Sequence, residues 1–247
     1  MGLAKLPEIS AKGATSAANG EVDKTAIRQA ATVVLWRDSQ AGVPQVLMGQ
    51  RGAKAAFMPS KYVFPGGAVD DADADVLLAI DLPATCATRL AVDASIAPQT
   101  LAAAAIRELW EETGLALGTQ GRWAAPPEDE GHDWAGFAAR GLLPSAAEMQ
   151  FIFRAITPPG RPRRFDARFF LVNAAQVAGD IDDFSAASDE LSHLHWIDLS
   201  ETRRLDLPFI TEVVLAEVAA VLQHGPAPGG VPFFDNSGSR PQFRRIV

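Results

Sequence analysis

Three glutamates in one short stretch, Glu108, Glu111 and Glu112, have a spacing that suits a divalent metal ion. On a helix with 3.6 residues per turn they share an arc of about 100°. Like charges held this close repel one another, and a bound cation reverses that repulsion because Mg²⁺ and Mn²⁺ prefer oxygen ligands. A bare Glu-x-x-Glu-Glu pattern is more often a solvated acidic helix face. The surrounding residues must therefore decide between the two interpretations.

The stretch from residue 101 to 113 has the composition of a helix that could position these carboxylates. It is rich in Ala, Leu, Arg and Glu, and Gly114 stands where a glycine commonly ends a helix. Ile106, Leu109 and Trp110 share the face opposite the glutamates. We therefore expect one face of this helix in a hydrophobic core and the other at a site.

The residues around the glutamates resemble the second half of the Nudix box, reading Arg107-Glu108-Leu109-x-Glu111-Glu112-x-Gly114-Leu115. Upstream, Phe64-Pro65-Gly66-Gly67 is similar to the first half of the box, and Asp73 stands where the family has a glutamate. Residues 74 to 106 separate Asp73 from Arg107, where the family has a much shorter spacer. The box therefore contains an insertion, which we place at about residues 74 to 98.

This resemblance implies an α/β fold, the Nudix fold, which is an α/β/α sandwich around a mixed β-sheet. It implies metal-dependent hydrolysis of a nucleoside diphosphate linked to another group, with water attacking phosphorus. The implied cofactor is Mg²⁺ or Mn²⁺, and by the family's pattern its ligands are Glu108, Glu111, Glu112 and the carbonyl of Gly67. The catalytic set then comprises the three glutamates and Arg107, which would pair with a carboxylate such as Asp73 and orient the cluster. The general base is one of these glutamates or Glu190.

Glycines before the helix have a physical reason in this interpretation. Only a residue without a Cβ lets the backbone turn sharply and approach a metal ion and a phosphate closely. Gly66 and Gly67 would otherwise predict a simple turn.

Several strands and helices must hold these segments in place. The pattern predicts strands over residues 27–37, 45–49, 148–156 and 164–172, and helices over residues 132–139 and 207–222. In the insertion we expect short helical pieces near the site entrance. Asp93 or Ser95 is expected to cap the box helix, with Pro98 in its first turn.

Substrate contacts are expected from the segment before the glycines and from a later strand. Arg51, Phe64 and Arg168 are the predicted substrate-binding residues, because arginines beside an acidic metal site can hold phosphate. Arg164, Asp166 and Arg168 alternate along one strand face, where they equally fit a solvated face with charge pairs. Glu190 is a candidate base, or a carboxylate of a solvated loop.

The insertion within the box and the Phe-Pro-Gly-Gly approach are similar to Nudix relatives of the coenzyme A diphosphatase type. Coenzyme A carries a 3′-phosphate, and its expected cationic partners are Arg51, Lys54 and Lys61. A non-catalytic Nudix module, sensing a nucleotide or binding a partner, is the alternative. The intact glutamates favour the enzyme.

Length and composition limit the remaining choices. The chain of 247 residues is 48% hydrophobic, which predicts a single domain over residues 25–247 behind a mobile tail at residues 1–24. Its net charge of −8 disfavours nucleic acid as a partner, and no apolar run suits a membrane span. The single cysteine, Cys86, fits the reducing cytoplasm. The tail from about residue 226 contains Val231-Pro232-Phe233-Phe234, apolar enough to pack on the body or on a second subunit of a homodimer.

Overall fold

The computed structural model describes residues 26–53, 55, 57–124, 134–238 and 240–247. The predicted N-terminal tail, Lys54 and the predicted start of the helix at residues 132–133 lie outside this part. Within it, no helix is long and apolar enough to cross a bilayer.

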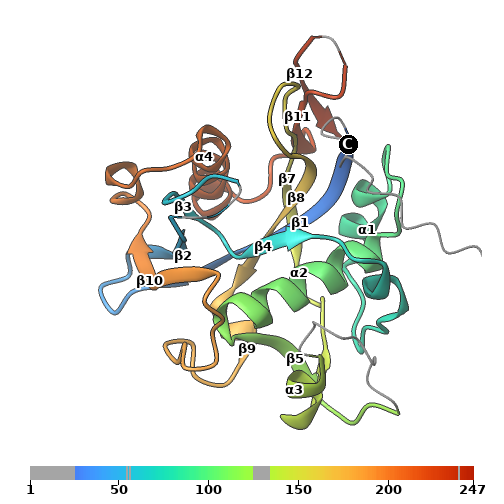
Figure 1. The fold of residues 1–247 in the computed structure, drawn as a ribbon, viewed down its shortest axis with the longest axis vertical. Coiled ribbons are helices and arrows are strands. Elements are labelled where there is room, and N and C mark those ends of the chain that lie inside the picture. Colours follow the sequence, from blue (N-terminus) through green and yellow to red (C-terminus); the bar gives the residue numbers. More distant parts are fainter. Residues whose placement is uncertain (1–25, 54, 56, 125–133, 239) are drawn as a thin grey trace, which may run out of the picture.

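A mixed sheet of nine strands, counted over the described residues, forms the centre of the molecule (Figure 1). Its order is β10-β2-β1-β8-β7-β11-β12, with β3 paired to β2 and β4 paired to β1. β1 runs parallel to β8, β7 runs parallel to β11, and the remaining neighbours are antiparallel. The strands are β1 (Ile27–Asp38), β2 (Pro44–Arg51), β3 (Tyr62–Val63), β4 (Gly66–Ala68), β7 (Gln150–Ile156), β8 (Arg164–Asn173), β10 (Leu191–Asp198), β11 (Val231–Asp235) and β12 (Gln242–Ile246).

One face of the sheet is covered by the box helix α2 (Pro98–Thr113). Ala31, Val33 and Leu35 of β1 point into the core that this helix closes, since alternate strand residues face the same side. The helix ends at Gly114, whose φ of 74° is left-handed and whose N–H donates to the carbonyl of Trp110 at 2.8 Å. The predicted helix is therefore confirmed.

The opposite face is covered by α4 (Phe209–His224). Val34 of β1 and Met48 of β2 belong to the core on this side, together with Val214 and Val218 of the helix. Helices on both faces of a mixed sheet make the predicted α/β/α sandwich. A small second sheet lies beyond α2, with order β6-β5-β9 (β5, Ala116–Gln120; β6, Leu142–Pro144; β9, Val177–Ala178), next to α3 (Trp134–Ala139).

A short 3₁₀ helix, Asp71–Asp75, leads into the inserted segment, which itself contains helix α1 (Ala84–Leu90). The predicted helical pieces are thus confirmed, but their predicted place is wrong. Val76, Leu82, Cys86 and Leu90 are buried in the core on the α2 side of the sheet. They pack there because an apolar segment of this length gains more by burial than by covering a polar entrance.

The predicted cap of the box helix is also wrong. Ala97 occupies the N-cap position without a side-chain hydrogen bond, and Pro98 is the first helical residue, as expected. The Asp93 carboxylate instead accepts a hydrogen bond from Arg244 at 2.7 Å. Proline at the first position needs no N–H partner, which lowers the need for a polar cap.

The C-terminal segment packs on the body as an antiparallel hairpin of β11 and β12. Phe233 of β11 pairs in register with Arg154 of β7, which extends the central sheet by two strands. Docking on the body is therefore the arrangement that the structure shows.

Candidate active site

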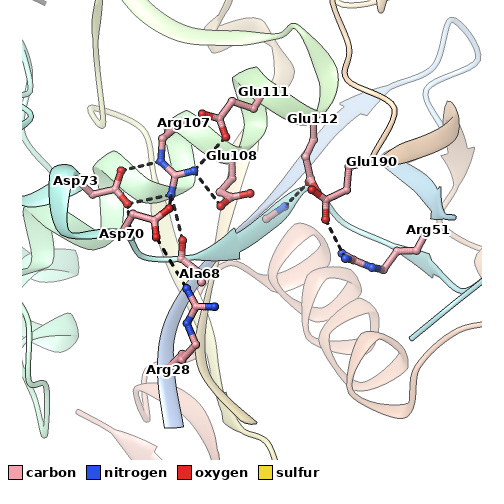
Figure 2. A network of polar contacts seen from close by, with 11 residues as sticks. Arg28, Arg51, Ala68, Asp70, Asp73, Arg107, Glu108, Glu111, Glu112 and Glu190 are labelled. Carbon is pink, nitrogen blue, oxygen red and sulfur yellow. Dashed lines mark hydrogen bonds and ion pairs between the residues drawn. The ribbon is translucent and has the colours of Figure 1, made fainter. Parts of the chain in front are cut away.

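A single guanidinium, that of Arg107, connects the two halves of the box (Figure 2). Its Nε and Nη2 donate to the two carboxylate oxygens of Asp73, at 2.8 and 3.0 Å. Its Nη1 donates to Glu108 and Glu111, each at 3.0 Å, and Nη2 also donates to the carbonyl of Ala68 at 3.0 Å. The predicted pairing of Arg107 with Asp73 is confirmed, and it fixes two of the three glutamates.

Asp73 reaches this position because of the 3₁₀ helix that leads into the insertion. Its side chain accepts a hydrogen bond from the backbone N–H of Asp70 at 2.9 Å, which forms a capping box. Asp73 is 1% exposed and Arg107 is 2% exposed, so the pair is shielded from water. The shorter carboxylate therefore still makes a two-pronged contact with the guanidinium.

Gly66 and Gly67 have no room for side chains, because Gly66 lies against strand β1 and Gly67 lies against Glu108 of the box helix. Gly66 has φ 155°, and a Cβ there would lie 2.6 Å from the carbonyl oxygen of Ala31. A Cβ at Gly67 would lie 2.4 Å from Oε1 of Glu108. As predicted, the absence of side chains at these glycines lets the backbone of strand β4 approach the carboxylates of Glu108 and Glu112 closely.

Glu112 is the most enclosed of the three glutamates. Its Oε2 accepts a hydrogen bond from the N–H of Gly66 at 2.8 Å, while its buried Oε1 has no hydrogen-bond partner among the described residues. Burial raises the pKa of Glu112 well above its usual value, and the charge of Glu108 adds to this effect. Burial likewise raises the pKa of Glu108 to about 7, against the lowering influence of Arg107. At Glu108 the effect of burial on the pKa thus outweighs that of the neighbouring Arg107, and a bound cation would oppose it at both carboxylates.

These observations fit a divalent cation at the glutamates. An unpaired, buried carboxylate oxygen and a glycine with space for no side chain are both features of an oxygen-lined metal site. Across the described residues, however, no group of three or more His, Cys, Asp or Glu side chains already converges on one point. The reason is visible in the contacts, since Arg107 holds Glu108 and Glu111 while Glu112 turns toward Gly66.

A cavity of about 760 Å³ opens from this cluster toward α4 and the C-terminal hairpin. Five of the predicted site residues line it, namely Arg51, Phe64, Gly67, Glu108 and Glu190. The Nη2 of Arg51 donates to Glu190 at 2.9 Å, so these two predicted residues meet at the cavity wall (Figure 2). The volume lies within the range of small-molecule sites.

Both the sequence and the fold are similar to those of known proteins. No family model matches the sequence. The putative Nudix hydrolase 7 of Caenorhabditis elegans is 31% identical over 183 residues, which is 70% of this chain and 52% of that protein. The chain thus spans about half the length of this curated relative. The crystal structure of a Nudix hydrolase from Alicyclobacillus acidocaldarius has 29% sequence identity and a TM-score of 0.58, covering 79% of this chain and 92% of that one.

The chain belongs to the Nudix hydrolase family. Both relatives carry that family's name, and the box glycines, Arg107 and the glutamates meet in one place as the box pattern requires. The Nudix helix is α2, and the insertion lies between the two halves of the Nudix box.

The Nudix fold places Arg168 away from the cavity, so its predicted role in substrate binding is wrong. Arg168 is 0% exposed and lies on the same face of β8 as Phe170, whereas Phe165, Ala167 and Phe169 line the cavity from the opposite face. Strand alternation explains the difference, because every second residue points to the other side of the sheet.

Buried charge pairing holds Arg168 in place. Its Nη1 lies 3.2 Å from the carboxylate of Asp166 and also donates to Gln29, and Asp166 accepts two hydrogen bonds from Arg154, at 2.8 and 2.7 Å. Burial lowers the pKa of Arg168 to about 10. For the predicted alternative, a solvated face with charge pairs, the charge pairs are confirmed, but the solvated face is wrong because the pairs lie in the interior.

Four charged residues at the Nudix site were not predicted from the sequence. Asp70 lies 3.6 Å from Nη2 of Arg107 and 3.8 Å from Nη2 of Arg28, which lines the cavity. Arg161 and Arg163 line the same cavity from the turn between β7 and β8. The two turn arginines follow a Pro-Pro-Gly sequence, a signal of a fixed turn that could have drawn attention to them.

Proposed function

We propose that this chain hydrolyses the diphosphate bond of a nucleoside diphosphate linked to another group, with a divalent cation as cofactor. The observation that carries the proposal is the buried, unpartnered Oε1 of Glu112 next to the glycine turn. A buried carboxylate without a partner is unfavourable in a protein that only needs to fold, whereas a cation compensates it.

Glu108, Glu111, Glu112 and the carbonyl of Gly67 would hold Mg²⁺ or Mn²⁺. When bound, the cation supplies charge stabilisation at the phosphoryl oxygens and a lower pKa for water. The raised pKa values of Glu108 and Glu112 agree with this role, because a nearby positive charge would lower them.

Arg107 acts as a positioning residue in this mechanism. Its buried guanidinium keeps Glu108 and Glu111 on one side of α2, with Asp73 holding the guanidinium itself. Rigid support of this kind matters because small displacements of catalytic groups lower the rate strongly.

Glu190 is the general base that we propose. It lies on the wall of the cavity that Glu108 also lines. Its side chain is 54% exposed, so it can reach water and pass a proton to solvent. Its hydrogen bond from Arg51 would keep it directed toward the site.

The substrate that we propose is a coenzyme A derivative. The cavity combines cationic groups with an aromatic pair, Phe57 and Phe165, whose ring centroids lie 5.4 Å apart. A ligand with phosphates and an extended, less polar portion suits such a lining.

The decisive experiment is a panel of nucleoside diphosphate derivatives incubated with Mg²⁺ or Mn²⁺ and analysed by mass spectrometry. We expect cleavage at the diphosphate bond, and a loss of about 10² to 10⁴ in rate for Glu112→Gln. Glu148→Gln removes an exposed carboxylate outside the cavity and serves as the control. Turnover by Glu112→Gln at the wild-type rate would overturn the proposal. Binding of a nucleotide without any cleavage would instead support the non-catalytic sensor.

A further inference from the structure

Cationic side chains along the cavity wall fall into two groups. Five of the described residues that line the cavity are basic, namely Arg28, Arg51, Lys61, Arg161 and Arg163. Three of them each have a carboxylate partner: Arg28 pairs with Asp70, Arg51 with Glu190, and Lys61 with Asp206.

The remaining two, Arg161 and Arg163, have no such partner. Among the described residues, none forms an ion pair or hydrogen bond with either guanidinium, and both residues are exposed. Their positive charge is therefore available to a ligand in the cavity, whereas that of the other three is largely compensated.

The turn that carries these arginines is fixed at its base. Thr157 and Phe165 exchange hydrogen bonds, with the N–H of Thr157 donating at 2.8 Å and the hydroxyl of Thr157 accepting at 3.0 Å. Arg164 donates to the carbonyl of Asn236 at 2.9 Å, which ties the turn to the C-terminal hairpin. Three prolines between residues 158 and 162 restrict the backbone further. Little conformational entropy is then lost when the arginines contact an anion.

We propose that Arg161 and Arg163 bind a phosphate monoester that the substrate carries apart from its diphosphate. This inference rests on the proposed function for the position of the diphosphate at the glutamates, and it assigns a second anionic subsite in the same cavity. Two arginines that line one cavity match a dianionic phosphate monoester in charge, whereas a single carboxylate would neutralise only one of them.

The subsite corrects an expectation about the same group. Arg51, Lys54 and Lys61 were the expected partners of a 3′-phosphate. Lys54 lies outside the described residues, and Arg51 and Lys61 each already have a carboxylate partner. A phosphate placed there would have to displace Glu190 or Asp206. At the turn arginines no such displacement is needed.

The test compares ligands that differ only in this phosphate. Calorimetry with Mg²⁺ present would measure binding of adenosine 3′,5′-bisphosphate, adenosine 2′,5′-bisphosphate and AMP to the wild type and to the double variant R161Q/R163Q. We expect the wild type to bind one bisphosphate at least about tenfold more tightly than AMP, since charge-assisted hydrogen bonds of this kind contribute about 10- to 100-fold. In R161Q/R163Q the ratio should fall close to one.

The control R122Q/R203Q makes the same change in net charge at two exposed arginines that do not line the cavity, and it should keep the wild-type ratio. Equal binding of both bisphosphates and AMP by the wild type, or an unchanged ratio in R161Q/R163Q, would overturn the subsite. A parallel comparison of kcat/KM for coenzyme A and its 3′-dephosphorylated form separates the two proposals. If the wild type cleaves neither compound but still binds a bisphosphate about tenfold more tightly than AMP, only the proposed function is contradicted. If it cleaves both compounds and R161Q/R163Q leaves their kcat/KM ratio unchanged, only the subsite is contradicted.

Discussion

Asp73 and Arg107 form a buried, two-pronged ion pair across the whole inserted segment, with contacts of 2.8 and 3.0 Å. Asp73 stands just before the insertion, and Arg107 follows it within helix α2. The pair therefore joins the two halves of the Nudix box in space although the sequence separates them. It explains how a long insertion is accommodated without displacing the glutamates.

Asp73→Asn should destabilise the fold strongly. The substitution weakens a buried two-pronged contact and leaves Arg107 with Glu108 and Glu111 as its charged hydrogen-bond partners, so we expect the free energy of unfolding to fall by about 1–3 kcal/mol. Urea unfolding monitored by circular dichroism would measure this. As a matched control, Asp182→Asn breaks the more exposed pair with Arg37 and should change stability by less than about 1 kcal/mol. Equal free energies of unfolding for the two variants would show that the buried pair stabilises the fold no more than the exposed pair does.

Gly67→Ala should reduce activity while leaving the fold intact. The added Cβ would lie 2.4 Å from the Glu108 carboxylate, so this side chain must move away from its position at the site. We expect kcat for the diphosphate substrate to fall about 10²-fold or more, because Glu108 is no longer correctly placed as a metal ligand. Steady-state kinetics would measure the change, alongside thermal unfolding.

Gly238→Ala is the appropriate control, since a Cβ there meets no atom within 4 Å. If Gly67→Ala kept normal turnover, the close approach of β4 to Glu108 would have no catalytic importance.

Leu90→Ala tests the role of the insertion. Leu90 is 1% exposed in the core on the α2 side, and truncating such a leucine typically lowers the free energy of unfolding by about 2–5 kcal/mol. Because none of residues 74–97 lines the cavity, the relative rates on different diphosphates should stay unchanged. A shifted substrate preference in a folded Leu90→Ala protein would restore the idea that the insertion shapes the pocket.

The thiol of Cys86 should be unreactive in the native protein. Cys86 is 7% exposed, and burial raises its pKa to about 11. At pH 8 only about one thiol in a thousand would be ionised, whereas an unfolded cysteine has a pKa near 8.5. Labelling with iodoacetamide at pH 8, followed by mass spectrometry, should give no adduct in buffer and one adduct in denaturant. Rapid labelling under native conditions would contradict the burial of α1.

Local signals were sufficient for the parts of the chain where pattern and structure coincide. The box helix, its end at Gly114 and the glycine turn follow from spacing and residue type, and the pairing of Arg107 with Asp73 was implied by the resemblance to the Nudix box. Strands β1 and β8 were also predicted close to their observed bounds.

Tertiary context decided the remaining features. Alternation in β8 predicts that Arg168 shares a face with Asp166, but it does not tell which face meets the cavity. In the same way, no local pattern reveals that Arg51 and Lys61 are paired with carboxylates from residues far along the chain. No local pattern indicates on which face of the sheet the apolar residues of the insertion pack, and the structure buries them on the α2 side.

The cavity is built from both ends of the described chain. Arg28 and Ala30 of β1 contribute to one part of its lining, and Phe234 and Asn236 of the C-terminal hairpin contribute to another. A nascent chain on the ribosome can therefore form the box helix well before it can enclose a ligand. Until residue 236 has been synthesised, β7 also lacks its partner β11 and presents an unpaired strand edge. Premature termination would thus yield products that are recognisable to chaperones and proteases and that lack a complete pocket.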